Sequence, residues 1–126
     1  MNKWIVLGVR VVFGLMLLAL GAMGFMNLPI PPGYPPDAEA FLVALANTGY
    51  MNPVISVVFI LVGLMFITGS FVALGALLLA PIIVNILLFH IFLDLKTIWL
   101  GLIVAVLNAF VAFTEWDKYR LLFRRK

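Results

Sequence analysis

The sequence predicts an all-α integral membrane protein: a four-helix bundle with a Pro-rich outer loop and a short amphipathic outer helix. Of its 126 residues, 66% are hydrophobic, and the mean hydropathy is +1.25, whereas a soluble domain is only about half apolar. The apolar residues also gather in four long runs. Because about 20 apolar residues in a helix cross the hydrocarbon layer, and the chain is short, we expect one membrane domain.

The four predicted spans cover about residues 4–26, 54–72, 74–93 and 98–114. The first and third are long enough to cross a bilayer, whereas the second and fourth use residues at their ends. Gly69 and Ser70 separate the second span from the third, although both could also lie inside a helix. The first run could instead be a signal peptide, but its length and the Arg10 inside it favour a span.

The predicted outer segment, residues 27–53, has two parts. Five prolines between positions 27 and 36 prevent a helix there and favour an extended chain. Asp37 is then expected to cap a helix that ends at Asn47 or Gly49, with Phe41, Leu42 and Leu45 on one face. A connector that covers the bundle is favoured over a lid that closes a site.

The basic residues predict the orientation. Lys3 and the tail, residues 115–126, place positive charge at the two ends of the chain, while residues 27–53 contain no Lys or Arg. The positive-inside rule therefore puts both termini in the cytoplasm, with Lys96 as the single exception. The net charge of +3 is concentrated in the tail, so we expect contact with anionic lipid and no binding of nucleic acid.

Small and polar residues form stripes on three of the spans. Such residues let membrane helices approach closely and hydrogen-bond across the contact, so these stripes predict the inner faces of a compact bundle. They comprise Arg10, Gly14, Leu17, Gly21 and Gly24 on the first span; Ser56, Gly63 and Ser70 on the second; and Gly101, Ala105, Asn108, Ala112 and Glu115 on the fourth.

Arg10 and Glu115 lie on two of these stripes, near the same side of the membrane. An unpaired Arg within a span is costly unless it pairs or extends to the headgroups. The sequence favours an Arg10–Glu115 pair that locks the first and fourth spans. Extension of Arg10 to the headgroups, or the binding of an anionic ligand, remains open.

Asn85, His90 and Asp94 are the polar residues of the third span. An amide in hydrocarbon needs a partner, so we expect Asn85 to face protein. His90 and Asp94 are four residues apart and share a face near the outer end, while Asn85 lies about 140° from His90 on a regular helix. His90 and Asp94 could form a proton relay or general base, or simply a polar helix end. With Tyr50, these three residues form the predicted ligand site, which the segment 37–50 would cover.

The sequence offers little for other chemistry. With one His and no Cys, we expect no metal site, and no nucleophile–base set or phosphate loop is visible. These features favour a protein without catalytic activity.

Several short motifs, taken in order, resemble the DoxX-like family of small bacterial membrane proteins. They are Arg10 followed by Gly14 and a Gly-rich end of the first span, the Pro-rich loop, Ala46-Asn-Thr-Gly-Tyr50, and the segment APIIVNILLFHIFLD at 80–94. The resemblance implies four spans in the bacterial cytoplasmic membrane. Some family members are similar to small subunits of a thiosulfate:quinone oxidoreductase. Members often carry a Lys after the Gly-rich end, where this chain has Asn27.

Two functions follow as hypotheses. The favoured one is a non-catalytic accessory subunit of a larger membrane complex, which could be a redox complex. The alternative is a protein that binds a quinone or lipid at His90 and Asp94 and takes part in redox chemistry. No cofactor is firmly implied, and a quinone is possible.

Overall fold

The computed structural model describes residues 2–26 and 28–125. The expected all-α fold is confirmed: four long apolar helices pack into a bundle, and each is long and apolar enough to cross a membrane. They are α1 (Lys3–Gly24), α3 (Met51–Thr68), α4 (Val72–Phe92) and α5 (Ile98–Thr114), the last extended by the 3₁₀ turn η1 (Leu95–Thr97). The chain is therefore a small multi-pass membrane protein.

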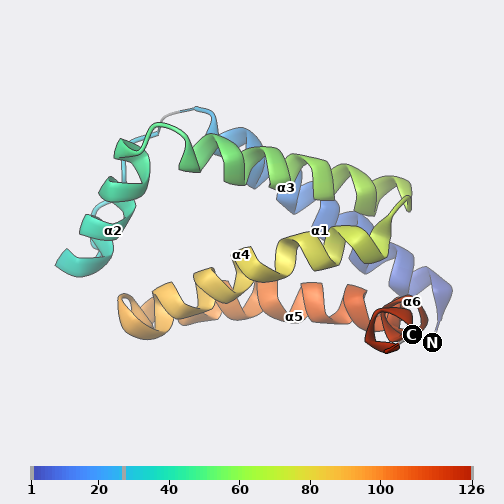
Figure 1. Ribbon diagram of the computed structural model, residues 1–126. Coiled ribbons are helices and arrows are strands. Elements are labelled where there is room, and N and C mark those ends of the chain that lie inside the picture. Colours follow the sequence, from blue (N-terminus) through green and yellow to red (C-terminus); the bar gives the residue numbers. More distant parts are fainter. Residues whose placement is uncertain (1, 27, 126) are drawn as a thin grey trace.

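The bundle consists of two helix pairs. The most extensive contacts are between α1 and α3 and between α4 and α5, and contacts of α3 with α4 join the pairs. Both ends of the chain lie at the same end of the bundle (Figure 1), which we call the terminal end. The opposite end, where α2 (Pro36–Asn47) lies, is called the loop end.

Most of the small-residue stripes lie inside the bundle as predicted, but Ser70 is exposed in the turn that follows α3. Gly14 and Gly63 are buried where α1 crosses α3, and a Cβ at either position would come within 2.8 Å of the other glycine's carbonyl oxygen. Around this crossing, Phe13 and Phe66 are fully buried with ring centroids 5.6 Å apart. Glycine at these positions therefore allows direct contact between two backbones.

The connections differ slightly from the predicted ones. The chain turns through Gly69, Ser70 and Phe71, and Gly69 has a positive φ of 77° that glycine adopts without strain. At the loop end, α2 begins at Pro36, so Asp37 lies inside its first turn and does not cap it. Proline is well suited to that position because the first helical residue needs no N–H donor.

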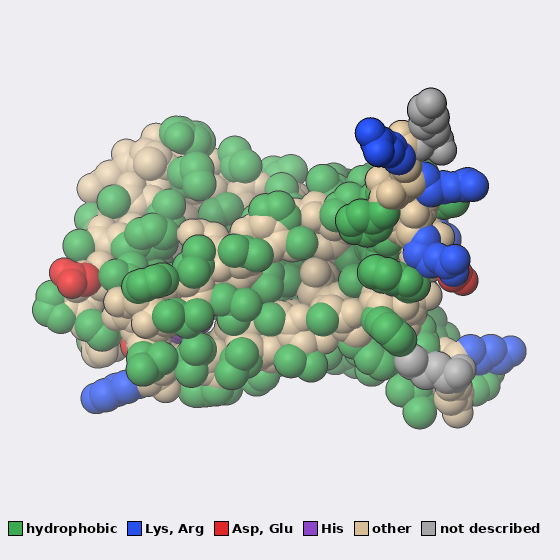
Figure 2. All heavy atoms as spheres, turned by 60° about the horizontal axis from the view of Figure 1, so that its bottom comes forward, with side chains coloured by type: hydrophobic (Ala, Val, Ile, Leu, Met, Phe, Trp, Pro, Cys, Tyr) green, Lys and Arg blue, Asp and Glu red, His purple; other side chains and the backbone are tan. Residues whose placement is uncertain are grey.

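The surface follows the expected division between lipid and water. Hydrophobic side chains cover the middle of the molecule, while most basic side chains gather at the terminal end (Figure 2). At that end α5 is followed by α6 (Trp116–Arg120) and the 3₁₀ turn η2 (Leu121–Phe123). These two short elements form the C-terminal segment, residues 116–123.

Candidate functional site

His90 and Asp94 lie at the loop end, and the structure brings them together with Thr97. His90 is 7% exposed and Asp94 is 4% exposed. The Thr97 hydroxyl donates to Asp94 Oδ2 at 2.6 Å, and His90 Nδ1 lies 3.2 Å from Thr97 Oγ1 and 3.3 Å from the Asp94 carbonyl oxygen. We call these three residues the outer polar network. Thr97 was not anticipated, because it follows the end of the predicted third span.

The contacts of His90 define its tautomer. A backbone carbonyl can only accept, and the Thr97 hydroxyl already donates its hydrogen to Asp94. Nδ1 must therefore carry a hydrogen, which it donates to these two oxygens. In the neutral ring Nε2 is then left as an acceptor. Gly101 of α5 gives the ring its space, since a Cβ there would lie 2.9 Å from His90 Cδ2.

A cavity of about 530 Å³ lies beside the network. Its walls are Pro31–Pro35 of the Pro-rich segment and, on the other side, Asp94–Thr97 and Leu100. Asp94 and Thr97 belong to both the network and the cavity wall, so a polar ligand in the cavity could reach the network. Lys96 adds a positive charge to this wall.

The cover over the network differs from the predicted one. The Pro-rich segment lines the same cavity as Asp94, whereas α2 packs on α4 through Phe41, whose ring centroid lies 5.4 Å from that of Phe89. Tyr50 is 60% exposed and does not line the cavity. The structure therefore does not bring Tyr50 to His90 and Asp94, because α3 begins at Met51 and leaves Tyr50 at its outer end.

Asn85 lies on the outer surface of α4. It is exposed, and its side chain has no hydrogen bond to any residue that the structure describes. Val84 and Leu88 beside it are also exposed. The expectation that Asn85 faces protein is therefore not met within the single chain, because α4 buries the face that carries His90.

Arg10 and Glu115 have separate partners. Arg10 Nε donates to the carbonyl oxygen of Phe66 at 2.8 Å, and Glu115 pairs with Lys118 at 2.6 Å. No ion pair joins Arg10 to Glu115 among the described side chains. Arg10 thus satisfies a carbonyl in the last turn of α3, which has no partner within that helix.

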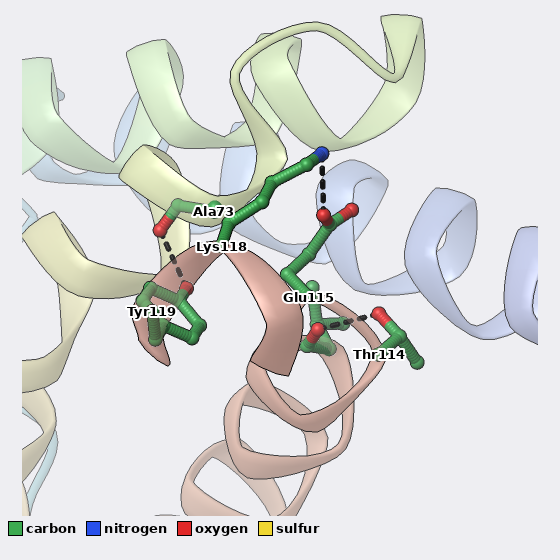
Figure 3. Close-up of polar contacts among 6 residues, drawn as sticks. Ala73, Thr114, Glu115, Lys118 and Tyr119 are labelled. Carbon is green, nitrogen blue, oxygen red and sulfur yellow. Dashed lines mark hydrogen bonds and ion pairs between the residues drawn. The ribbon is translucent and has the colours of Figure 1, made fainter. Parts of the chain in front are cut away.

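Contacts at the terminal end hold the C-terminal segment against α4. The Tyr119 hydroxyl donates to the carbonyl oxygen of Ala73 at 2.5 Å, next to the Glu115–Lys118 pair (Figure 3). Burial raises the pKa of Tyr119 above 10.0, and the negative charge of Glu115 raises it further. The phenol is therefore neutral around pH 7 and remains a donor.

The chain defines a class, the small four-span membrane proteins, but comparison does not identify a family. It matches no protein-family model, no curated protein and no solved structure. In the described part of the chain, no group of three or more His, Asp or Glu side chains could hold a metal ion.

Proposed function

We propose that this chain is a small accessory subunit of a larger membrane complex, without catalytic activity of its own. The observation that carries the proposal is the exposed Asn85. This residue lies three positions from the midpoint of α4, about 5 Å along the helix axis, and so near the centre of the hydrocarbon layer. An amide there is costly without a hydrogen-bond partner, and a second membrane protein would supply one.

The surface around Asn85 also suits a helix partner. Val84, Leu88 and Phe92 form an exposed apolar stripe beside it, and Pro81 lies one turn away. Apolar packing around a single interhelical amide is a common basis for association in membranes. The resemblance to the DoxX-like family, some of whose members are similar to subunits of a redox complex, is compatible with this role.

Replacing Asn85 with leucine should reduce the amount of co-purifying membrane protein several-fold, because the interhelical hydrogen bond is lost. The measurement is a pull-down from native membranes in mild detergent, with quantitative mass spectrometry. Asn52→Leu is the matched control, since Asn52 is also exposed but lies in the first turn of α3. Equal recovery of partners with both variants would contradict the proposal.

The outer polar network supports a second candidate function, the binding of a quinone or another lipid with a polar head group. The buried His90–Asp94–Thr97 contacts lie beside a cavity of about 530 Å³, a volume typical of small-molecule sites. Asp94 and Thr97 line this cavity, whereas His90 lies behind them and contacts Thr97 through Nδ1. The same contacts would also stabilise the end of α4 without any ligand.

The location follows from charge. We propose that both termini lie in the cytoplasm, because Lys3, Lys118, Arg120, Arg124 and Arg125 belong to the terminal end. The resemblance to the DoxX-like family implies that the membrane is a bacterial cytoplasmic one. In intact cells, cysteines introduced at positions 2 and 125 should resist an impermeant thiol reagent, and one at position 34 should react. The chain has no native cysteine to interfere. Labelling of position 125 in intact cells would contradict this orientation.

A further inference from the structure

A second cavity lies at the terminal end, in the seam between α1 and α5. It measures about 400 Å³, and its lining comes from the first half of α1 and the last residues of α5: Lys3, Val6, Leu7, Arg10, Phe113 and Thr114. Contacts between α1 and α5 are sparse compared with those between α1 and α3. Leu7 is 38% exposed and Phe113 is 68% exposed, so the seam opens sideways toward lipid.

Arg10 brings a positive charge without a counter-ion to this cavity. Its Nε donates to the carbonyl oxygen of Phe66 at 2.8 Å, but that partner is neutral. Among the described side chains, no carboxylate forms an ion pair with Arg10. Glu115 is paired with Lys118 at 2.6 Å and does not line the cavity. Because Arg10 is half-buried in a membrane helix, its charge is costly without an anion nearby.

The guanidinium of Arg10 also has unused hydrogen-bond donors. It carries five N–H groups, and Nε uses one of them. Nη1 and Nη2 have no partner among the described residues. Neither of them is buried, since Asn108 Oδ1 is the one buried side-chain atom without a partner in the described part of the chain. Gly69 leaves them room, because a Cβ there would lie 3.0 Å from Arg10 Nη2. Both nitrogens are therefore accessible to a ligand.

Lys3 supplies a second positive charge on the same face of α1. It lies seven residues before Arg10, which is about 10 Å along the helix axis and about 20° around it. Side chains on a helix lean toward its N-terminus, so the side chain of Arg10 leans toward Lys3. Lys3 Nζ lies 5.7 Å from the centroid of the Trp4 ring, a contact that is weak at an exposed site. Lys3 can therefore turn toward an anion beside Arg10.

The donors of the cavity match a phosphate group. Arginine binds phosphate oxygens through paired N–H groups, and lysine adds a point charge. Thr114 adds no donor, because its hydroxyl already donates to the carbonyl oxygen of Val111 at 2.6 Å. No carboxylate lines the cavity to repel an anion.

The opening of the cavity favours a lipid as the source of this phosphate. Acyl chains attached to the phosphate would lie against the exposed side chains of Leu7 and Phe113, whereas free phosphate gains nothing from them. A zwitterionic headgroup brings its own ammonium, which Lys3 and Arg10 would repel. A volume of about 400 Å³ is in the range of small-molecule sites, so the headgroup can enter while the chains remain in the bilayer.

We propose that this cavity binds the phosphate of an anionic glycerophospholipid, with Arg10 as the main donor and Lys3 as a second cation. The site lies at the opposite end of the bundle from the outer polar network, and Asn85 takes no part in it. The proposal therefore does not rest on the accessory role, and failure of either one leaves the other standing.

Native mass spectrometry of the full-length protein in a neutral detergent tests the proposal. The probes are phosphatidylglycerol and phosphatidylcholine with the same acyl chains, and the dissociation constant of the first bound lipid is measured for each. Phosphatidylglycerol should bind at least about tenfold more tightly, because its net negative charge meets two cations. Equal affinity for the two lipids would overturn the proposal.

Calorimetry with inorganic phosphate distinguishes the two sources of the anion. Titration of the protein in the same detergent should show no saturable binding of phosphate up to millimolar concentrations. Saturable binding that is lost in Arg10→Gln would show that the site takes free phosphate, and would overturn the assignment to a lipid.

Three variants locate the binding of phosphatidylglycerol. Arg10→Gln should weaken it about tenfold, through loss of charge-assisted hydrogen bonds, and Lys3→Gln about fivefold. Arg124→Gln is the matched control, since Arg124 is exposed and does not line the cavity, and should change the affinity little. If Arg10→Gln does not fold, Lys3→Gln still decides, because Lys3 is exposed at the start of α1. Equal effects of Lys3→Gln and Arg124→Gln would mean that the lipid responds only to overall charge, and would overturn the proposal.

Discussion

Replacing Gly14 with valine should destabilise the bundle by about 1–3 kcal/mol or more, because the new side chain would push α1 away from α3. A Cβ at this position would lie 2.8 Å from the Gly63 carbonyl oxygen and 2.8 Å from Ile67 Cγ1. The first of these atoms belongs to the backbone of a packed helix, so it cannot move aside as a flexible side chain could. Separation of the two helices would also disturb the buried contact between Phe13 and Phe66.

Gly8 provides the matched control on the same helix. A Cβ at Gly8 would have nothing within 4 Å, so Gly8→Val should change stability by a few tenths of a kcal/mol at most. The free energy of unfolding of both variants can be measured in mixed micelles by titration with a denaturing detergent. Equal stability of Gly14→Val and Gly8→Val would show that α1 and α3 do not cross at these glycines.

The small-residue inner faces of α1 and α3 could be predicted because their signal is local to each helix, whereas the stripes alone do not say which two helices cross. Gly14, Gly21 and Gly63 recur at helical spacing, and small residues at that spacing have one main use in a membrane. The buried positions of Gly101 and Asn108 on α5 could be predicted in the same way. Four spans, their order and their inward stripes thus follow from periodicity and length.

The partners of the charged residues could not be predicted, because one of them is a backbone group. Arg10 and Glu115 are identified from the sequence as residues of opposite charge. A free backbone carbonyl such as that of Phe66 cannot be identified from the sequence. That carbonyl is available only because α3 ends two residues later, at Thr68. Likewise, Lys118 reaches Glu115 because the chain continues as α6 after the span.

The outward position of Asn85 follows from its angle to His90 around the helix. His90 and Asn85 lie about 140° apart around a regular helix, so both could not face the bundle. His90 has a polar neighbour one turn away in Asp94, and the structure buries that face. Asn85 is then directed outward. An intramembrane amide needs a hydrogen-bond partner, but the sequence of a single chain does not say which molecule provides it.

Replacing Asp94 with valine should lower the free energy of unfolding by about 1–3 kcal/mol, because it leaves the half-buried Thr97 hydroxyl without its carboxylate acceptor. Asp94 is 4% exposed and accepts the Thr97 hydroxyl at 2.6 Å. Asp94→Asn retains one acceptor oxygen and should cost less. Asp37 is the matched control, since it is exposed in the first turn of α2, where loss of a carboxylate costs at most about 1 kcal/mol.

The substitution His90→Phe distinguishes a structural role of the outer polar network from a role in ligand binding. Phenylalanine keeps most of the bulk of His90 beside Gly101 and removes both the Nδ1–H donor and the Nε2 acceptor. His90 does not line the cavity of about 530 Å³, but it contacts Thr97, which does. If the cavity binds a quinone through Thr97 and Asp94, His90→Phe should lower the amount of bound quinone, whereas Asp37→Asn should retain it. Bound quinone can be measured by extraction from the purified protein, and redox activity in the native membrane. A destabilised His90→Phe variant with unchanged quinone content would leave the network with a structural role alone, since its contacts would then hold α4 to η1 without touching a ligand.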